Sequence, residues 1–162
     1  MTPELVADAF EHGVGATFNA CFNRAETNTF SEPWEHEATV RHLDDVTVTP
    51  ARGMLEGRRI RLGRCALLAV GGIEVAVSSI RQQITSDDYL AAIGADTESA
   101  RVFIVKSRGH FRAGFDHLVD DANIIEVDCP ALATPNLHAL PWNKVMRPIY
   151  PLDPEMEWSP SG

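Results

Sequence analysis

The sequence of 162 residues lacks a cysteine framework, a long apolar run and an excess of positive charge. Its three cysteines, Cys21, Cys65 and Cys129, are far apart and form no CxxC pair, which predicts reduced thiols in the cytoplasm. The longest apolar run, residues 66–70, is far shorter than the roughly 20 residues of a membrane span. The net charge of -9 disfavours nucleic acids and anionic membrane surfaces as partners, because both attract basic proteins.

The composition is that of a folded domain, with 44% hydrophobic and 23% charged residues. A chain of this length can bury one core without disulfides or metal. Seven of the ten prolines follow residue 129, so the end of the chain should wrap the surface in short turns. We therefore predict one domain over residues 1–153 and a frayed tail over residues 154–162.

The first half of the chain predicts antiparallel strands. A helix is expected over residues 2–11, with Thr2 as its cap and Pro3 in its first turn. Alternating apolar residues predict a strand after Gly15, followed by a polar loop over residues 24–36. Two short strands are expected on either side of a turn at Asp44 and Asp45. The clearest signal is a β-hairpin over residues 64–80, in which two β-prone runs flank a Gly-Gly turn, and a short helix over residues 88–94 follows it.

The pattern changes after residue 100. Two apolar runs, residues 100–107 and 123–128, flank a helical pattern in which Phe111 and Phe115 share one face. A strand, a helix and a second strand at this spacing predict a right-handed βαβ unit with parallel strands. The fold class is therefore α+β: antiparallel strands with a β-hairpin, then a βαβ unit, in a single domain.

No residues in the chain form a recognisable catalytic or metal-binding pattern. The six histidines include no HExxH pair. His110 and His117 would lie two helical turns apart, about 10 Å, which is too far for one tetrahedral ion. Ser107 lacks the first glycine of a GxSxG nucleophile turn and suits a helix cap better. We predict no catalytic residue and no metal or other cofactor in this chain, whose status as an enzyme stays open.

One basic segment remains as a candidate binding site. It follows a predicted parallel strand and begins a helix, where open α/β sheets bind ligands and a helix N-terminus favours anions. The alternative is a solvated basic loop that pairs with nearby acids. The predicted substrate-binding residues are Lys106, Ser107, Arg108, His110 and Arg112.

Four stretches carry a resemblance to a known family. They are GVGAT at 13–17, GRCALLAVGGIEVAVSS at 63–79, VKSRGHFRAGF at 105–115 and RPIYPLD at 147–153. In this order they resemble the C-terminal domain of the microcystinase C (MlrC) family, the M81 metallopeptidase-like proteins. The resemblance covers nearly the whole chain. One departure is the loop at 23–37, which is glycine-rich in the family and has no glycine here.

The resemblance implies a function shared with a second domain. Family members resemble zinc-dependent hydrolases that cleave peptide bonds, and their metal ligands and acidic catalytic residue lie in a larger N-terminal domain absent from this sequence. It implies an accessory domain that closes the active-site cleft, with zinc held by the missing domain. We further expect the segment from Lys106 to Arg112 to face that cleft. The expected partners are such an N-terminal catalytic domain, or a second copy of this chain, and a peptide-like substrate. The alternative is a free-standing binding module for a carboxylate-bearing peptide or small metabolite.

Overall fold

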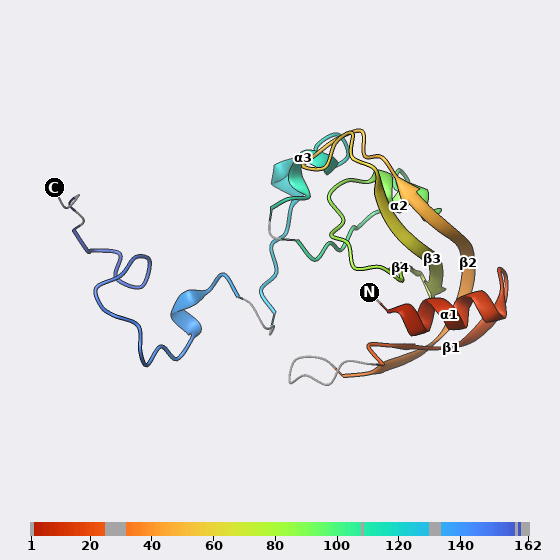
Figure 1. Cartoon of the computed structure of the whole chain (residues 1–162), viewed down its shortest axis with the longest axis horizontal. Helices are drawn as coiled ribbons and strands as arrows, with labels where there is room; N and C mark the ends of the chain where they lie inside the picture. Colours follow the sequence, from red (N-terminus) through yellow and green to blue (C-terminus); the bar gives the residue numbers. More distant parts are fainter. Residues whose placement is uncertain (1, 25–31, 108, 130–133, 158, 160–162) are drawn as a thin grey trace. The chain divides into compact units, whose positions relative to one another are not determined.

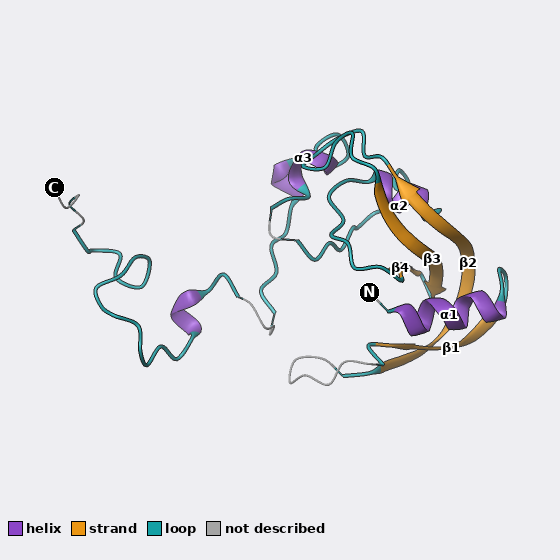
Figure 2. Cartoon of the chain, in the orientation of Figure 1, coloured by secondary structure: helices purple, strands orange, loops and turns teal. Residues whose placement is uncertain are grey.

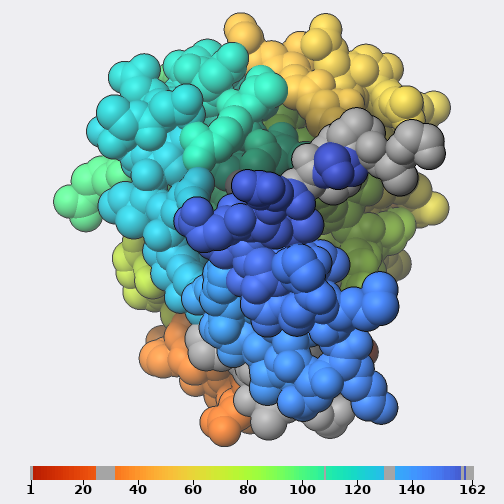
Figure 3. Space-filling model, turned by 90° about the vertical axis from the view of Figure 1, so that its left-hand side faces the viewer, coloured from red at the N-terminus to blue at the C-terminus, as the bar shows by residue number. Residues whose placement is uncertain are grey.

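The computed structural model describes residues 2–24, 32–107, 109–129, 134–157 and 159. The chain divides into two units, Met1–Ile125 and Glu126–Gly162. The second unit contains a short 3-10 helix, η2 (Leu137–Ala139), and exposes apolar side chains such as Met146 and Tyr150. Figure 3 colours most of this unit blue. Within the described ranges, no helix has the length and apolar character to span a membrane.

The first unit is built on a four-stranded sheet. Its strands are β1 (Thr17–Phe22), β2 (Trp34–Val48), β3 (Ile60–Val70) and β4 (Ile73–Ser78). They lie in the order β1-β2-β3-β4, and every neighbouring pair is antiparallel (Figure 2). Helix α1 (Pro3–His12) packs across this sheet, as Figure 1 shows. The predicted α+β class is confirmed.

The predicted hairpin is confirmed as β3 and β4. Val70 pairs with Ile73 across the two-residue turn, and Gly71 has a φ of +59°. Glycine adopts a positive φ without the steric cost that a Cβ brings, which is what a tight hairpin turn of this type requires. The turn chemistry therefore sets the register of the two strands.

Both faces of the sheet are buried around β3. Successive residues of a strand point to opposite faces, so Leu68 packs toward α1 while Leu67 packs toward α2 (Asp88–Ala92). This explains why residues 65–70 read as one continuous apolar run, a pattern typical of a strand covered on both sides. The α1 side holds Leu5, Val6, Ala9, Phe18, Phe22, Val40 and Leu68; the α2 side holds Val46, Leu62, Cys65, Leu67, Tyr89 and Ile93.

The prediction of a loop and two short strands between residues 23 and 49 is wrong. Strand β2 is continuous, and Asp44 and Asp45 pair within it with Cys65 and Arg64 of β3. Backbone pairing with β3 outweighs the turn propensity of the two aspartates. This pairing is possible because their side chains stay exposed to solvent while their backbones form the strand. Irregularities at Val40/His42 and Val46/Thr47 accommodate the strand's length. Residues 34–37 pair with β1, whereas residues 25–31 of the predicted loop lie outside the described residues.

The predicted βαβ unit is also wrong. The helical pattern contains only a short helix α3 (Arg112–Phe115) and a 3-10 turn η1 (Asp121–Asn123). The described residues of 100–107 and 123–128 form no strand. A strand needs a neighbour for its backbone hydrogen bonds, and neither run pairs with any described strand. Ile104 and Ile125 are 94% and 86% exposed as a result.

Candidate functional site

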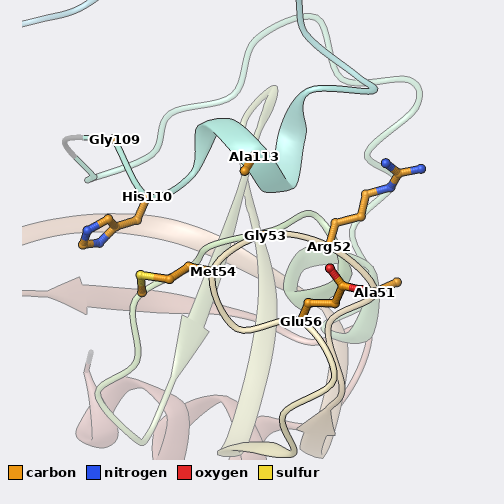
Figure 4. Close-up of a pocket in the computed structure, with 8 residues that line it drawn as sticks. All are labelled: Ala51, Arg52, Gly53, Met54, Glu56, Gly109, His110 and Ala113. Carbon is orange, nitrogen blue, oxygen red and sulfur yellow. The ribbon is translucent and has the colours of Figure 1, made fainter.

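A shallow hollow lies in the first unit, between the β2–β3 connection and the turn that begins α3. Figure 4 shows Arg52 and Glu56 on one side of the hollow and Met54 and His110 on the other. Its walls therefore combine both signs of charge with a thioether and an imidazole, which suits a small polar ligand that carries charge. The lining residues are Ala51, Arg52, Gly53, Met54, Glu56, Gly109, His110 and Ala113.

Two glycines bring the walls of this hollow together. A Cβ on Gly114 of α3 would overlap the backbone oxygen of Thr85 and lie 2.7 Å from the Cα of Ser86. Gly53, with a φ of +83°, would place a Cβ 3.0 Å from the same oxygen. Thr85 and Ser86 are completely buried. Three backbones thus cross with no side chain between them, which glycine alone permits, and this glycine crossing positions both walls.

Asp88 holds the first wall in place. Its Oδ2 accepts a hydrogen bond from the backbone N–H of Ala51 at 2.9 Å and another from the hydroxyl of Ser86 at 3.0 Å. Hydrogen bonds to an ionised carboxylate are stronger than those between neutral groups. The wall is therefore anchored to the start of α2 before any ligand binds.

The structure describes four of the five predicted substrate-binding residues, because Arg108 lies outside the described residues. Lys106 is exposed and forms no ion pair within the described part of the chain. The Ser107 hydroxyl accepts a hydrogen bond from the Gln83 amide at 2.9 Å. Ser107 does not cap α3, whose N-cap is Phe111, so the prediction of a capping serine is wrong. The helix begins later than its apolar pattern indicated.

Arg112 and His110 both have partners, and only His110 lines the hollow. The Arg112 guanidinium donates to Asp121 at 2.7 Å and lies 5.6 Å above the centre of the Phe111 ring. The Nδ1 atom of His110 is 3.1 Å from Oε1 of Gln83. Asp121 balances the charge of Arg112, so the basic segment is less cationic than its composition indicated.

His117 is placed in a separate group of charges. Its Nε2 is 3.2 Å from Asp87 Oδ2, its Nδ1 is 3.7 Å from Asp116 Oδ1, and Asp116 is 3.9 Å from Arg52. These contacts link the end of α3 to the start of α2 and to the β2–β3 connection. Across the residues that the structure describes, no three His, Cys, Asp or Glu side chains gather to hold a metal ion.

Cys65 is not a nucleophile at neutral pH. It is buried on the α2 side of the sheet, and its thiol lies 3.4 Å from the backbone oxygen of Gly63. Burial raises the pKa of the Cys65 thiol to about 11, with smaller contributions from Asp45 and Asp44. The reactive form of cysteine is the thiolate, so Cys65 serves as an apolar core residue.

Sequence reasoning missed Gln83 and the wall formed by the β2–β3 connection. Gln83 lies 24 and 27 residues before its two partners, Ser107 and His110, and no local pattern links them. The β2–β3 connection carried a weaker signal in the sequence, which is the presence of two glycines, Gly53 and Gly57, within one short segment. Both adopt a positive φ in the structure. Glycines at that density indicate a loop with a defined shape.

Comparison with known proteins decides the family. The family model described as "MlrC C-terminus" matches residues 1–144. The chain belongs to the MlrC C-terminus family. The match extends from α1 through the hollow and the basic segment, so the expected resemblance to the microcystinase C family is confirmed. The RPIYPLD stretch at 147–153 lies just beyond the residues that the family model matches.

Two relatives show how much of a longer protein this MlrC C-terminal region represents. Microcystinase C from Sphingomonas sp. is 27% identical over 153 residues, which are 94% of this chain and 28% of that protein. A crystal structure from Mesorhizobium sp. BNC1, provisionally assigned as a metallopeptidase, is 27% identical with a TM-score of 0.76. It covers 97% of this chain, which in turn covers 31% of that protein. The chain thus spans less than one third of the length of either relative.

Proposed function

We propose that this chain is the C-terminal accessory domain of a metallohydrolase that cleaves peptide bonds. The observation that carries the proposal is the family match over residues 1–144 in a chain that spans 28% and 31% of its two relatives. The names of those relatives describe a microcystinase and a metallopeptidase, which supports the reaction class. In this proposal the zinc and the catalytic residues belong to an N-terminal domain, and this chain contributes to substrate binding.

Exposed apolar residues before and after α3 support a partner domain. Val102, Ile104 and Ile125 are 79%, 94% and 86% exposed. In the first run the intervening Phe103 and Val105 are half-buried, so the segment alternates as a strand does, yet its outer side is apolar. Exposed apolar surface and unpaired strand-like backbone are the features used when a strand is added from a partner. We infer that the N-terminal domain covers these runs and that a second copy of the chain is the competing partner.

The hollow and the basic segment are the proposed substrate-binding part. Lys106 is exposed and lacks an ion pair within the described ranges, so its ammonium group can bind the carboxylate of a peptide. Ser107, Arg108, His110 and Arg112 complete the proposed set, with Arg112 also bridging to Asp121. Two aspartates in and just after α3 pair with arginines: Asp116 with Arg52 and Asp121 with Arg112.

Light scattering on the purified chain tests the proposal, both alone and mixed with the N-terminal domain of an MlrC-type protein. We expect a complex in the mixture, and peptide hydrolysis only in the mixture supplied with zinc. Ile104→Asp should abolish the complex, because it places a charge on the apolar outer side. Val14→Asp is the matched control: Val14 is also exposed and apolar, but it lies in the turn between α1 and β1.

A chain that stays monomeric and ignores the added domain would contradict the accessory-domain proposal. It would favour the free-standing binding module, for which the exposed Lys106, with no ion pair within the described ranges, is the supporting observation. Titration calorimetry with a carboxylate-bearing dipeptide then distinguishes the two, since Lys106→Ala should weaken binding to the chain alone.

We also propose the cytoplasm as the location of the protein. Cys21, Cys65 and Cys129 are free thiols in the structure, and they are spread over three regions of the chain. Free thiols persist best in a reducing compartment. Mass measurement of alkylated protein from native cells would contradict this location if the thiols were found oxidised.

A further inference from the structure

The Gln83 side chain joins two residues of the basic segment. Its Nε2 donates a hydrogen bond to the hydroxyl oxygen of Ser107 at 2.9 Å, and its Oε1 lies 3.1 Å from Nδ1 of His110. Gln83 comes from the segment between β4 and α2, whereas its partners come from the chain before α3. One side chain thus contacts two of the proposed substrate-binding residues, Ser107 and His110.

The hydrogen-bonding groups of the Gln83 amide restrict which ring nitrogen of His110 carries the hydrogen. The NH₂ group of a glutamine only donates, and its carbonyl oxygen only accepts. With the NH₂ group directed to Ser107, the carbonyl faces His110, and the contact between them is a hydrogen bond only if the Nδ1 atom of His110 carries the hydrogen. A neutral imidazole has one N–H, so Nε2 then holds an unshared electron pair.

We propose that Gln83 is a positioning residue that holds His110 in the Nδ1–H tautomer, so that Nε2 accepts a hydrogen bond from an N–H group of the ligand. His110 lines the hollow, so its Nε2, which bonds to none of the described residues, belongs to a residue that a bound ligand would contact. His110 then recognises a donor, such as the backbone amide or the amino group of a peptide.

This assignment refines the proposed function and rests on it for the nature of the ligand. A peptide presents both groups that the segment then recognises: a carboxylate for Lys106 and an N–H donor for His110. A simple anion such as phosphate offers no N–H and would leave the acceptor unused. The site is therefore specific for a peptide-like ligand over a plain anion.

The test is nitrogen NMR of the His110 ring in the isolated chain at a pH where the imidazole is neutral. The two ring nitrogens give separate signals that show which one carries the hydrogen, and His110→Ala assigns them by removing both. We expect the Nδ1–H form in the unmodified protein. An Nε2–H form would overturn the proposal, because the amide would then face the other way.

Two variants test whether Gln83 positions the His110 ring or only stabilises the fold. Gln83→Glu keeps an acceptor at the same place and should preserve the Nδ1–H signature, whereas Gln83→Met keeps the length, removes the acceptor and should lose it. Gln82→Met is the matched control, since Gln82 donates to the backbone oxygen of Gln83 and contacts neither Ser107 nor His110 in the hydrogen bonds of the described residues. If Gln83→Met kept the signature of the unmodified protein, Gln83 would not set the tautomer and the proposal would fail.

The two proposals fail in different ways. The NMR result depends only on Gln83 and His110, and the complex with an N-terminal domain depends on the apolar runs around α3. In an active complex, Gln83→Met should raise KM several-fold for a peptide substrate with little change in kcat, and Gln83→Glu should restore it. An unchanged KM would contradict the ligand contact, while a missing complex would contradict the accessory-domain proposal alone.

Discussion

The sheet and the segment that follows residue 100 differ in how far they bury their apolar side chains. In β3, Leu68 is completely buried between α1 and its neighbouring strands, and the residues around it form one core. In the later segment, Ile104 and Ile125 are 94% and 86% exposed, although each lies beside other apolar residues in its run. Each strand of the sheet pairs with a neighbour in this chain, whereas neither later run pairs with a strand among the described residues. Apolar sequence therefore stabilises a fold only where the complementary surface is present.

Phe115 is the exception that sharpens this comparison. It belongs to the later segment, yet it is only 3% exposed and meets Phe103 and Phe111 in edge-to-face contacts. Phe115→Ala should lower the free energy of unfolding by about 3–5 kcal/mol, because it leaves a cavity. Ile104→Ala, in the same segment, should stay within about 0.5 kcal/mol. Urea unfolding of the two variants checks this, and equal losses would show that Ile104 packs in this chain after all.

The glycine crossing should give the next largest effect. Gly114→Ala forces a Cβ into the Thr85 backbone, which cannot move aside as a flexible side chain would, so we expect a loss of about 1–3 kcal/mol. Gly109→Ala is the matched control, because a Cβ there meets nothing within 4 Å. Thermal melts of both variants are the measurement. A Gly114→Ala protein that melts with the control would mean that the walls of the hollow are not held by this crossing.

The smallest effect is expected in the second unit, where a turn depends on local charge. Hydrogen bonds from Arg147 and from the backbone N–H of Ile149 lower the pKa of Asp153 to about 2. A carboxyl with a depressed pKa stabilises the folded form above its ordinary pKa and stops doing so as the pH falls through the lower value. The turn at 147–153 should therefore loosen between about pH 4 and pH 2.

NMR signals of Ile149 and Asp153 followed over this pH range test that prediction. Asp153→Asn should show the loosened turn already at neutral pH, while the sheet signals stay unchanged. A turn that persists in Asp153→Asn would mean that apolar contacts, and not the carboxylate, hold the second unit at this point.

Short sequence patterns correctly predicted the elements that depend on neighbouring residues in the chain. The Gly-Gly turn and the alternation beside it are enough to specify β3 and β4, and Pro3 marks the start of α1. Asp44 and Asp45 misled the interpretation of β2, because their turn propensity is a local preference and the pairing with β3 is not. The prediction of parallel strands was wrong for a related reason. Half-buried and exposed residues do alternate over residues 102–105, but this alternation does not show where a neighbouring strand would come from.

The candidate site was predicted only in part. The basic segment stood out by charge, so Lys106 and His110 could be named before their surroundings were visible. The pairing of Arg112 with Asp121 and the contact of Gln83 with His110 arise from the folding of separate segments onto each other. No spacing in the sequence encodes such contacts, and the opposite wall at Ala51 to Glu56 was missed for the same reason.

The apolar runs around α3 also bear on how the chain behaves at high concentration. Molecules that carry a net charge of -9 repel one another, and this colloidal repulsion keeps runs such as residues 102–105 from meeting. The repulsion vanishes near the isoelectric point of about 5.0, where unpaired strand-like backbone and exposed isoleucines from different molecules can stack. The net negative charge thus opposes aggregation through the exposed apolar runs at neutral pH.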